Sequence, residues 1–320
     1  MLTACTPAPH GVPGHPAHTN WAPLEVAFDA LGALLGPSGA GGCVMDLASG
    51  ESWSRNGEIR FPLGRLDEVV IAANLLEAWA QGRHSPERTL QVRPTDLAPG
   101  LPDAGARTRN GESASLAALL RRMLLGDACA HDLLLRELGG PGLLTAWLRE
   151  RRLPGISLDR YGRQLLCEAA GLAPFRPSWA DPAVFAQTRQ AVSAQARSAA
   201  WERFASAKED GCTPRTAAAL VLALEGTQLA PRKDSAALFS LFGDHARSTF
   251  PTGGARARLV VLGRPLQASL AGAFRATAGR IESRGGLYAA SVFLRGRGLA
   301  EADADRLEAK AWAAITQALA

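Results

Sequence analysis

The two ends of this chain carry strand patterns, whereas its middle carries helix patterns. Near the amino end, the short apolar run Gly42–Leu47 is followed by a Ser-Gly turn and a return segment at Glu51–Arg55. Towards the carboxyl end, Leu259–Leu262, Phe274–Arg280 and Leu287–Leu294 read as strands separated by glycine-rich turns. Because short strands need partners, we expect both ends to share one sheet and the helical middle to be inserted between them.

Apolar residues at helical spacing fill most of the remaining chain. The predicted helices are Leu24–Leu35, Val69–Ala80, Leu116–Leu125, Ala130–Leu138, Leu143–Arg151, Pro182–Ala207, Pro214–Leu224 and Ala300–Ala320. We therefore predict an α/β (α+β) fold: an antiparallel sheet flanked by N- and C-terminal helices, plus an inserted all-α lobe. The expected division is a disordered tail at 1–22, a sheet domain at 23–61 and 250–320, and an all-α domain at 62–249.

Composition excludes several classes of function. The chain has 320 residues, 47% of them hydrophobic and 20% charged, as in ordinary globular proteins. Its net charge of +5 comes from dispersed arginines, so we expect no nucleic-acid partner. No run approaches the roughly 18 apolar residues of a membrane helix. The five cysteines lack metal-site spacing, and we expect no metal and no cofactor. The oligomeric state stays open.

The first residues leave localisation open. Leu2-Thr3-Ala4-Cys5 resembles a bacterial lipobox, in which the cysteine is lipidated, but the basic and apolar regions that normally precede one are missing. Two alternatives follow. The protein is periplasmic or lipid-anchored if Cys5 is a lipobox cysteine whose upstream signal is missing, and otherwise it is cytoplasmic.

Arg60–Glu77 (RFPLGRLDEVVIAANLLE) carries a family resemblance. It resembles the F-P-x-x-S-x-x-K segment of class A β-lactamases and related penicillin-recognising serine hydrolases, where Ser is the nucleophile and Lys helps to take its proton. Four further matches follow in the family's order, with an opening hairpin at Gly41–Arg60 before them. They are Leu116–Gly140 (the S-D-N loop), Asp159–Leu166 (the loop below the active site), Thr213–Leu224, and Ala271–Leu294 (the K-T-G strand).

The chain departs from the family at the chemical positions. Arg65 and Glu68 stand at the Ser and Lys positions of S-x-x-K. The S-D-N loop is Gly126-Asp127-Ala128, and Gly162 stands where class A enzymes have the deacylating Glu. The K-T-G triplet corresponds to Arg280-Ile281-Glu282, followed by Ser283. Arginine has no hydroxyl and does not deprotonate at ordinary pH, so the resemblance implies the scaffold of a serine hydrolase without its nucleophile.

The substituted residues suggest a second use of the cleft. In the family fold the S-x-x-K helix faces the K-T-G strand, which would bring Arg65, Glu68, Arg280 and Glu282 together. One hypothesis is a charge network there, with Glu68–Arg280 as a candidate pair; the alternative is that these side chains are separately solvated. Asp127 is expected to organise its loop, and Cys129 to be a buried thiol.

Three functions remain open at this point. The first is a catalytically inactive relative of the β-lactamases, a pseudoenzyme that binds a small anionic ligand or a peptidoglycan fragment, with Arg65, Glu68, Asp127, Arg280 and Ser283 as candidate cleft residues. The second is a hydrolase of the family that uses other residues. The third is a protein-interaction module, which an exposed apolar stripe on residues 182–207 would favour. Apparent insertions at about 172–210 and 243–263 have no assigned role.

Overall fold

A five-stranded antiparallel sheet joins the two ends of the chain, in the strand order β2-β1-β9-β8-β7. The computed structural model describes residues 19–100, 108–206, 208–249, 257–262, 271–283 and 285–320. The strands of this sheet are β1 (Ala40–Asp46), β2 (Ser52–Arg55), β7 (Ala257–Leu262), β8 (Gly272–Ser283) and β9 (Gly286–Arg297). Val44 of β1 lies opposite both Trp53 of β2 and Ala290 of β9, so the amino-terminal hairpin pairs directly with the carboxyl-terminal one.

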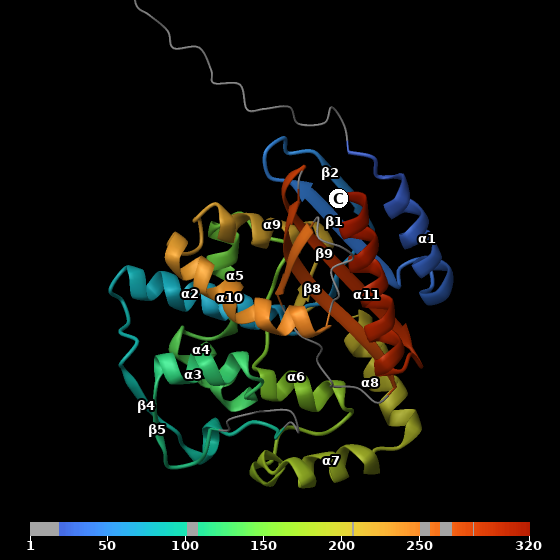
Figure 1. The fold of residues 1–320 in the computed structure, drawn as a ribbon. Helices are drawn as coiled ribbons and strands as arrows, with labels where there is room; N and C mark the ends of the chain where they lie inside the picture. Colours follow the sequence, from blue (N-terminus) through green and yellow to red (C-terminus); the bar gives the residue numbers. More distant parts are fainter. Residues whose placement is uncertain (1–18, 101–107, 207, 250–256, 263–270, 284) are drawn as a thin grey trace, which may run out of the picture.

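Two terminal helices cover one face of this sheet (Figure 1). They are α1 (Ala22–Leu35), which begins with a proline in its first turn and ends at Gly36 with φ of +87°, and α11 (Glu301–Ala318). Phe28 and Trp312 are buried between these helices and the sheet. The predicted fold class, an antiparallel sheet flanked by N- and C-terminal helices, is confirmed.

The opposite face of the sheet packs against a helical lobe (Figure 1). Its helices are α2 (Leu66–Ala80), α3 (Leu116–Leu124), α4 (Ala128–Glu137), α5 (Pro141–Glu150), α6 (Gly162–Ala169), α7 (Pro182–Ala191), α8 (Ala194–Ser206), α9 (Pro214–Glu225) and α10 (Arg232–Thr249), with short 3-10 turns η1 (Pro94–Asp96) and η2 (Pro177–Ala180). Helix α2 is buried along nearly its whole length, which explains its almost continuous apolar sequence.

The lobe differs from the prediction in three details. Residues 62–249 also contain strand β4 (Thr89–Gln91) paired with β5 (Ser113–Ser115), and β3 (Phe61–Pro62) pairs with β6 (Gly211–Cys212). The predicted helix Pro182–Ala207 is broken, because Val192 at the end of α7 takes an extended conformation. Helices α6 and α10 are not predicted by the sequence patterns.

An ion pair between Arg160 and Asp210 joins the two ends of the segment that contains the long insertion. Arg160 Nε lies 2.6 Å from Asp210 Oδ2, and Asp210 also accepts hydrogen bonds from the backbone N–H groups of residues 159 and 160. The chain between them forms α6, η2, α7 and α8 before it returns.

No helix in the described stretches is long and apolar enough to cross a membrane. The tail at 1–18, with Cys5, and residues 250–256 and 263 of the second insertion lie outside the described residues.

Candidate active site

The start of α2 holds Arg65, the residue that the family resemblance aligns with the nucleophile. Strand β3 leads through Gly64, with φ of +58°, into Arg65, the residue that caps the helix. A Cβ at Gly64 would come within 3.0 Å of Phe274 on β8, so the chain approaches the sheet too closely there for a side chain. Arg65 is 5% exposed and Glu68 is fully buried, and their side chains form an ion pair. The two residues that the resemblance aligns with the family's nucleophile and base are thus buried charges paired with each other.

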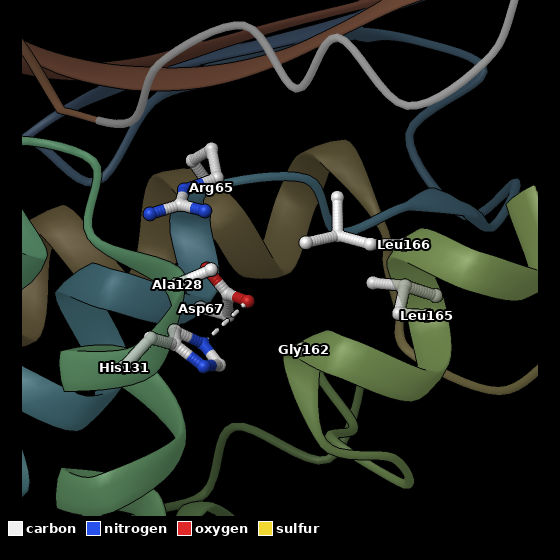
Figure 2. Close-up of a pocket in the computed structure, with 7 residues that line it drawn as sticks. All are labelled: Arg65, Asp67, Ala128, His131, Gly162, Leu165 and Leu166. Carbon is white, nitrogen blue, oxygen red and sulfur yellow. Dashed lines mark hydrogen bonds and ion pairs between the residues drawn. The ribbon is translucent and has the colours of Figure 1, made fainter. Parts of the chain in front are cut away.

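A second charged cluster lies directly beside this pair, between α2 and α4 (Figure 2). His131 Nε2 is 2.9 Å from Asp67 Oδ2, and its Nδ1 is 3.1 Å from Asp132 Oδ1. All three side chains are buried. One imidazole therefore joins a carboxylate on α2 to a carboxylate on its own helix.

The two carboxylates set the protonation state of His131. Burial by itself lowers the pKa of the imidazole, but the charges and hydrogen bonds of Asp67 and Asp132 outweigh it and raise that pKa to about 9. The group is therefore an imidazolium at neutral pH, with both nitrogens donating. A protonated imidazole has no lone pair with which to accept a proton, so His131 does not offer a general base in this state.

Asp132 extends the cluster to the loop that carries Gly162. The backbone N–H groups of Gly162 and Arg163 donate to the two oxygens of Asp132, at 2.7 and 3.2 Å. A Cβ added at Gly162 would lie 3.0 Å from both Asp132 Oδ1 and His131 Nδ1. Gly162, which the resemblance aligns with the deacylating Glu, is thus too close to the His131 cluster to accept a side chain without a shift.

Little free space remains between these groups. A cavity of about 10 Å³ is lined by Arg65, Asp67, Ala128, His131, Gly162, Leu165 and Leu166 (Figure 2). That volume has room for about one water molecule and none for a substrate. Among the described residues, this hollow beside Arg65 is too small for a substrate.

The S-D-N region keeps its structural residue. Asp127 Oδ1 accepts from the N–H of Cys129 at 2.9 Å and so caps α4, while its Oδ2 accepts from the N–H of Thr108 at 2.6 Å. This agrees with the expected role in organising the loop. Gly126 has φ of +98°, and Ala128 is buried against the small cavity. Burial raises the pKa of the Cys129 thiol, and its Sγ contacts the carbonyl of residue 96, so it is a buried thiol as expected.

The residues assigned to the K-T-G triplet lie near the end of β8. Arg280 Nε is 3.2 Å from Glu225 on α9, and its guanidinium lies over the ring of Phe239 on α10. Ile281 points to the other face of the sheet, into the core beneath α11. Glu282 is exposed, and Ser283 accepts a hydrogen bond from the N–H of residue 285. Of the triplet, Arg280 is the residue that contacts the helical lobe.

The structure groups the predicted charges into separate pairs. A Cβ added at Gly64, just before α2, would contact Phe274 and Ala276 of β8. Arg280 follows Ala276 by four residues, or about 13 Å along a strand. The ion pairs described join Glu68 to Arg65, and Arg280 to Glu225 and Glu282. A direct Glu68–Arg280 contact would have to bridge the distance along β8 and stays a prediction.

The three residues that organise this site, Asp67, His131 and Asp132, carry no recognisable sequence motif. Asp67 reads as an ordinary acidic residue in the first turn of a helix, and His131 and Asp132 have no assigned role together. One signal is present: His131 and Asp132 interrupt the apolar sequence of the predicted helix Ala130–Leu138. Among the described residues, no group of three or more His, Cys, Asp or Glu side chains is arranged to hold a metal ion.

The sheet with terminal helices on one face and a helical lobe on the other, with β3 leading into buried α2 at their junction, defines a β-lactamase/transpeptidase-like fold. Residues 27–319 match the model of the family described as "Beta-lactamase enzyme family". The chain belongs to that family.

Relatives and solved structures agree on this assignment. The chain is 32% identical over 142 residues to "Beta-lactamase CARB-4" of Pseudomonas aeruginosa, an alignment that covers 44% of this chain and 47% of the relative. A β-lactamase of Rhodobacter capsulatus is 32% identical over 144 residues, covering 45% and 47%. The chain thus spans about half the length of these curated relatives.

Solved structures extend the match over nearly the whole chain. The chromosome-encoded β-lactamase of Vibrio parahaemolyticus has a TM-score of 0.68 at 18% identity, covering 92% of this chain and 98% of that one. An ancestral class A β-lactamase has a TM-score of 0.68 at 22% identity, covering 92% and 99%. At these identities the likeness shows the fold alone.

Proposed function

We propose that this protein is a non-hydrolytic member of the β-lactamase family that acts by binding. The observation that carries the proposal is Arg65, which stands at the nucleophile position, is 5% exposed and is ion-paired with fully buried Glu68. A guanidinium cannot form the acyl-enzyme that serine chemistry requires. The relatives are named β-lactamases, but the residue type at this one position argues against carrying their activity over to this chain.

Among the residues that the structure describes, the groups beside Arg65 give no substitute mechanism. A nucleophile needs an adjacent base, and the imidazole that lines the small cavity with Arg65 is the His131 imidazolium, held between two carboxylates. The Cys129 thiol is buried, its pKa is raised, and it is not among the groups lining the small cavity. Removal of nucleophile and base together leaves at most the residual rate that binding and polar groups provide.

The interaction-module alternative has less support. It would be favoured by an exposed apolar stripe on the inserted helices, and Val184 is the one large apolar side chain described as exposed within 182–206. The anionic-ligand hypothesis at Arg65 meets a different obstacle. Such a ligand would have to displace Glu68 from Arg65 and enlarge a cavity that holds about one water.

A chromogenic cephalosporin assay at high protein concentration tests the proposal. We expect no ring opening above that of a mock purification from the same host, and no mass increase when the intact protein is incubated with a β-lactam. Arg65→Ala serves as the matched variant and should behave as the parent does. Turnover by the parent that disappears in His131→Gln or Cys129→Ala would overturn the proposal and identify the replacement group.

A further inference from the structure

A much larger cavity lies on the far side of α6 from the closed site. Its volume is about 510 Å³, within the range of small-molecule sites. It is lined by Pro94, Thr95, Arg163, Gln164, Cys167, Glu168, Leu172, Ala173, Pro174, Phe175 and Pro177. Two walls come from η1 and α6, and the third comes from the first residues of the insertion predicted at about 172–210. The insertion therefore builds a hollow that the rest of the lobe does not provide.

The insertion wall is largely apolar and is supported from behind. Leu172 and Phe175 are half-buried and pack against a small core made by Cys167, Trp179 and Phe185. The rings of Phe175 and Trp179 meet edge-on, with centroids 6.5 Å apart. A wall held by aromatic packing keeps its shape, which lowers the entropic cost of binding a ligand against it.

Arg163 supplies a cation at the amino end of α6. Its Nη1 donates to the carbonyl of Thr95, its Nε lies 3.6 Å from Asp132, and its guanidinium stacks over the ring of Tyr161. About a quarter of the side chain is exposed. The Asp132 carboxylate is already hydrogen bonded to the His131 imidazolium and to two backbone N–H groups, so it neutralises Arg163 only in part.

Glu168 supplies the opposite charge at the carboxyl end of the same helix. Its Oε2 accepts from Arg160, but Arg160 also pairs with buried Asp210 at 2.6 Å, so one guanidinium is shared by two carboxylates. Just over half of the Glu168 side chain is exposed. The two ends of the cavity therefore differ in sign, with a cation at 163 and excess negative charge at 168.

We propose that this cavity binds a zwitterionic, largely apolar molecule with the dimensions of a di- or tripeptide. Five residues of helix separate Arg163 from Glu168, a rise of about 7.5 Å. An extended peptide advances about 3.3–3.6 Å per residue, so a di- or tripeptide has a length of this order. The proposal assigns its terminal carboxylate to Arg163 and its terminal ammonium to Glu168. The side chains between these ends lie against Leu172, Pro174 and Phe175. The proposal goes beyond the loss of hydrolysis and does not depend on it.

Calorimetric titration of the full chain with a tripeptide of three leucines tests this assignment. The same peptide is titrated with its amine acetylated and, separately, with its carboxylate converted to an amide. We expect the free peptide to bind most tightly and each capped form to bind about three- to fivefold more weakly, as for partly exposed ion pairs.

Two variants test which end of the peptide each charged residue binds. Arg163→Met should abolish the difference between the free acid and the amide while keeping the difference between the amine and the acetyl form. Glu168→Gln should do the reverse. Ala173→Trp, which fills the hollow from an exposed wall position, should abolish binding of all three peptides, and Arg203→Met, an exposed arginine on α8 outside the lining, should change nothing.

The proposal is overturned if the folded parent protein binds none of the peptides at millimolar concentration, or binds all three equally. It is also overturned if Arg163→Met and Glu168→Gln each weaken the three peptides alike, which would indicate a general loss of structure. Thermal unfolding of every variant checks that comparison. None of these outcomes depends on cephalosporin turnover, so failure here and failure of the proposed function are distinguishable.

Discussion

Two buried charged clusters of this protein look alike in composition but lie in different places. One is Asp67, His131 and Asp132, between α2 and α4 beside the closed cavity. The other is behind the sheet, where Arg275 of β8 and Glu308 of α11 are each 1% exposed. Both contain a group whose pKa is shifted, to about 9 for His131 and to about 7 for Glu308.

The second cluster shows that a shifted pKa does not by itself indicate chemistry. Burial is the main cause of the raised Glu308 pKa, against the opposing effects of Thr277 and Arg275. Thr277 Oγ1 donates to Glu308 at 2.6 Å, and Trp312 Nε1 donates to Thr277 at 3.1 Å. These contacts hold α11 on the sheet. The His131 cluster, by analogy, is explained by its role in joining α2, α4 and the loop at Gly162.

Loss of Arg275 should give the largest effect on stability. Arg275 pairs with Glu301 at 2.8 Å and Asp305 at 2.6 Å and lies 3.6 Å from buried Glu308, so Arg275→Met leaves three carboxyl groups at the base of α11 without their shared cation. We expect a loss of about 3–5 kcal/mol in the free energy of unfolding, measured by urea titration at pH 7. Arg306→Met, an exposed arginine on α11, should cost less than about 1 kcal/mol. Equal losses would mean that the cluster does not stabilise α11.

His131→Gln should give the next largest effect, and one that depends on pH. The folded pKa of about 9 lies above the ordinary value of 6.5, so the imidazolium stabilises the fold fully below pH 6.5 and this contribution is lost as pH rises through 9. A rise in pKa of this size corresponds to about 3 kcal/mol. The difference in unfolding free energy between parent and variant should therefore shrink from pH 6 to pH 9.5. A difference that stays constant over this range would contradict a charged His131.

Glu308→Gln should sharpen the comparison with a smaller effect in a different pH window. A folded pKa of about 7 against an ordinary 4.5 means that Glu308 binds its proton more tightly in the folded state, so parent stability falls as pH rises from 4.5 through 7. The variant lacks this fall. Between pH 4.5 and pH 7 we expect the unfolding free energy of the variant to rise by about 2 kcal/mol relative to that of the parent. This is less than the full pKa shift implies, because Arg275 interacts with the same carboxyl. A parent–variant difference that does not vary between pH 4.5 and 7 would show that Glu308 is ionised throughout.

The sequence predicts the parts of the fold that follow from local patterns. The main sheet strands and most helices lie within a few residues of their predicted bounds, since periodicity and turn residues specify them. Helix α6 escapes prediction because it is short and begins at Gly162, and the three-residue strands β4 and β5 are too short to show a pattern. Arg65 and Glu68 are recognisable as replacements because they sit inside a motif that the family resemblance aligns.

The rest of the site depends on packing that no local pattern encodes. His131 and Asp67 are 64 residues apart and meet only because α2 and α4 pack together. Whether Arg280 faces the start of α2 depends on the register of β8. A register shift of a few residues moves a side chain along the strand by more than the length of a hydrogen bond. The cavity behind α6 has no sequence signal, since its apolar wall is a set of prolines and single apolar residues in an insertion.

The ion pair of Arg160 with Asp210 has a consequence for how this protein can vary. Both ends of the segment 160–210 are fastened at one point, while its helices α6 and α8 pack against the lobe and the sheet. Loop-closure entropy rises only slowly with length, so residues can be gained or lost in the connections between these helices with little change in stability. The segment is thus the region of the molecule best suited to acquire a new binding specificity while the rest of the scaffold stays fixed.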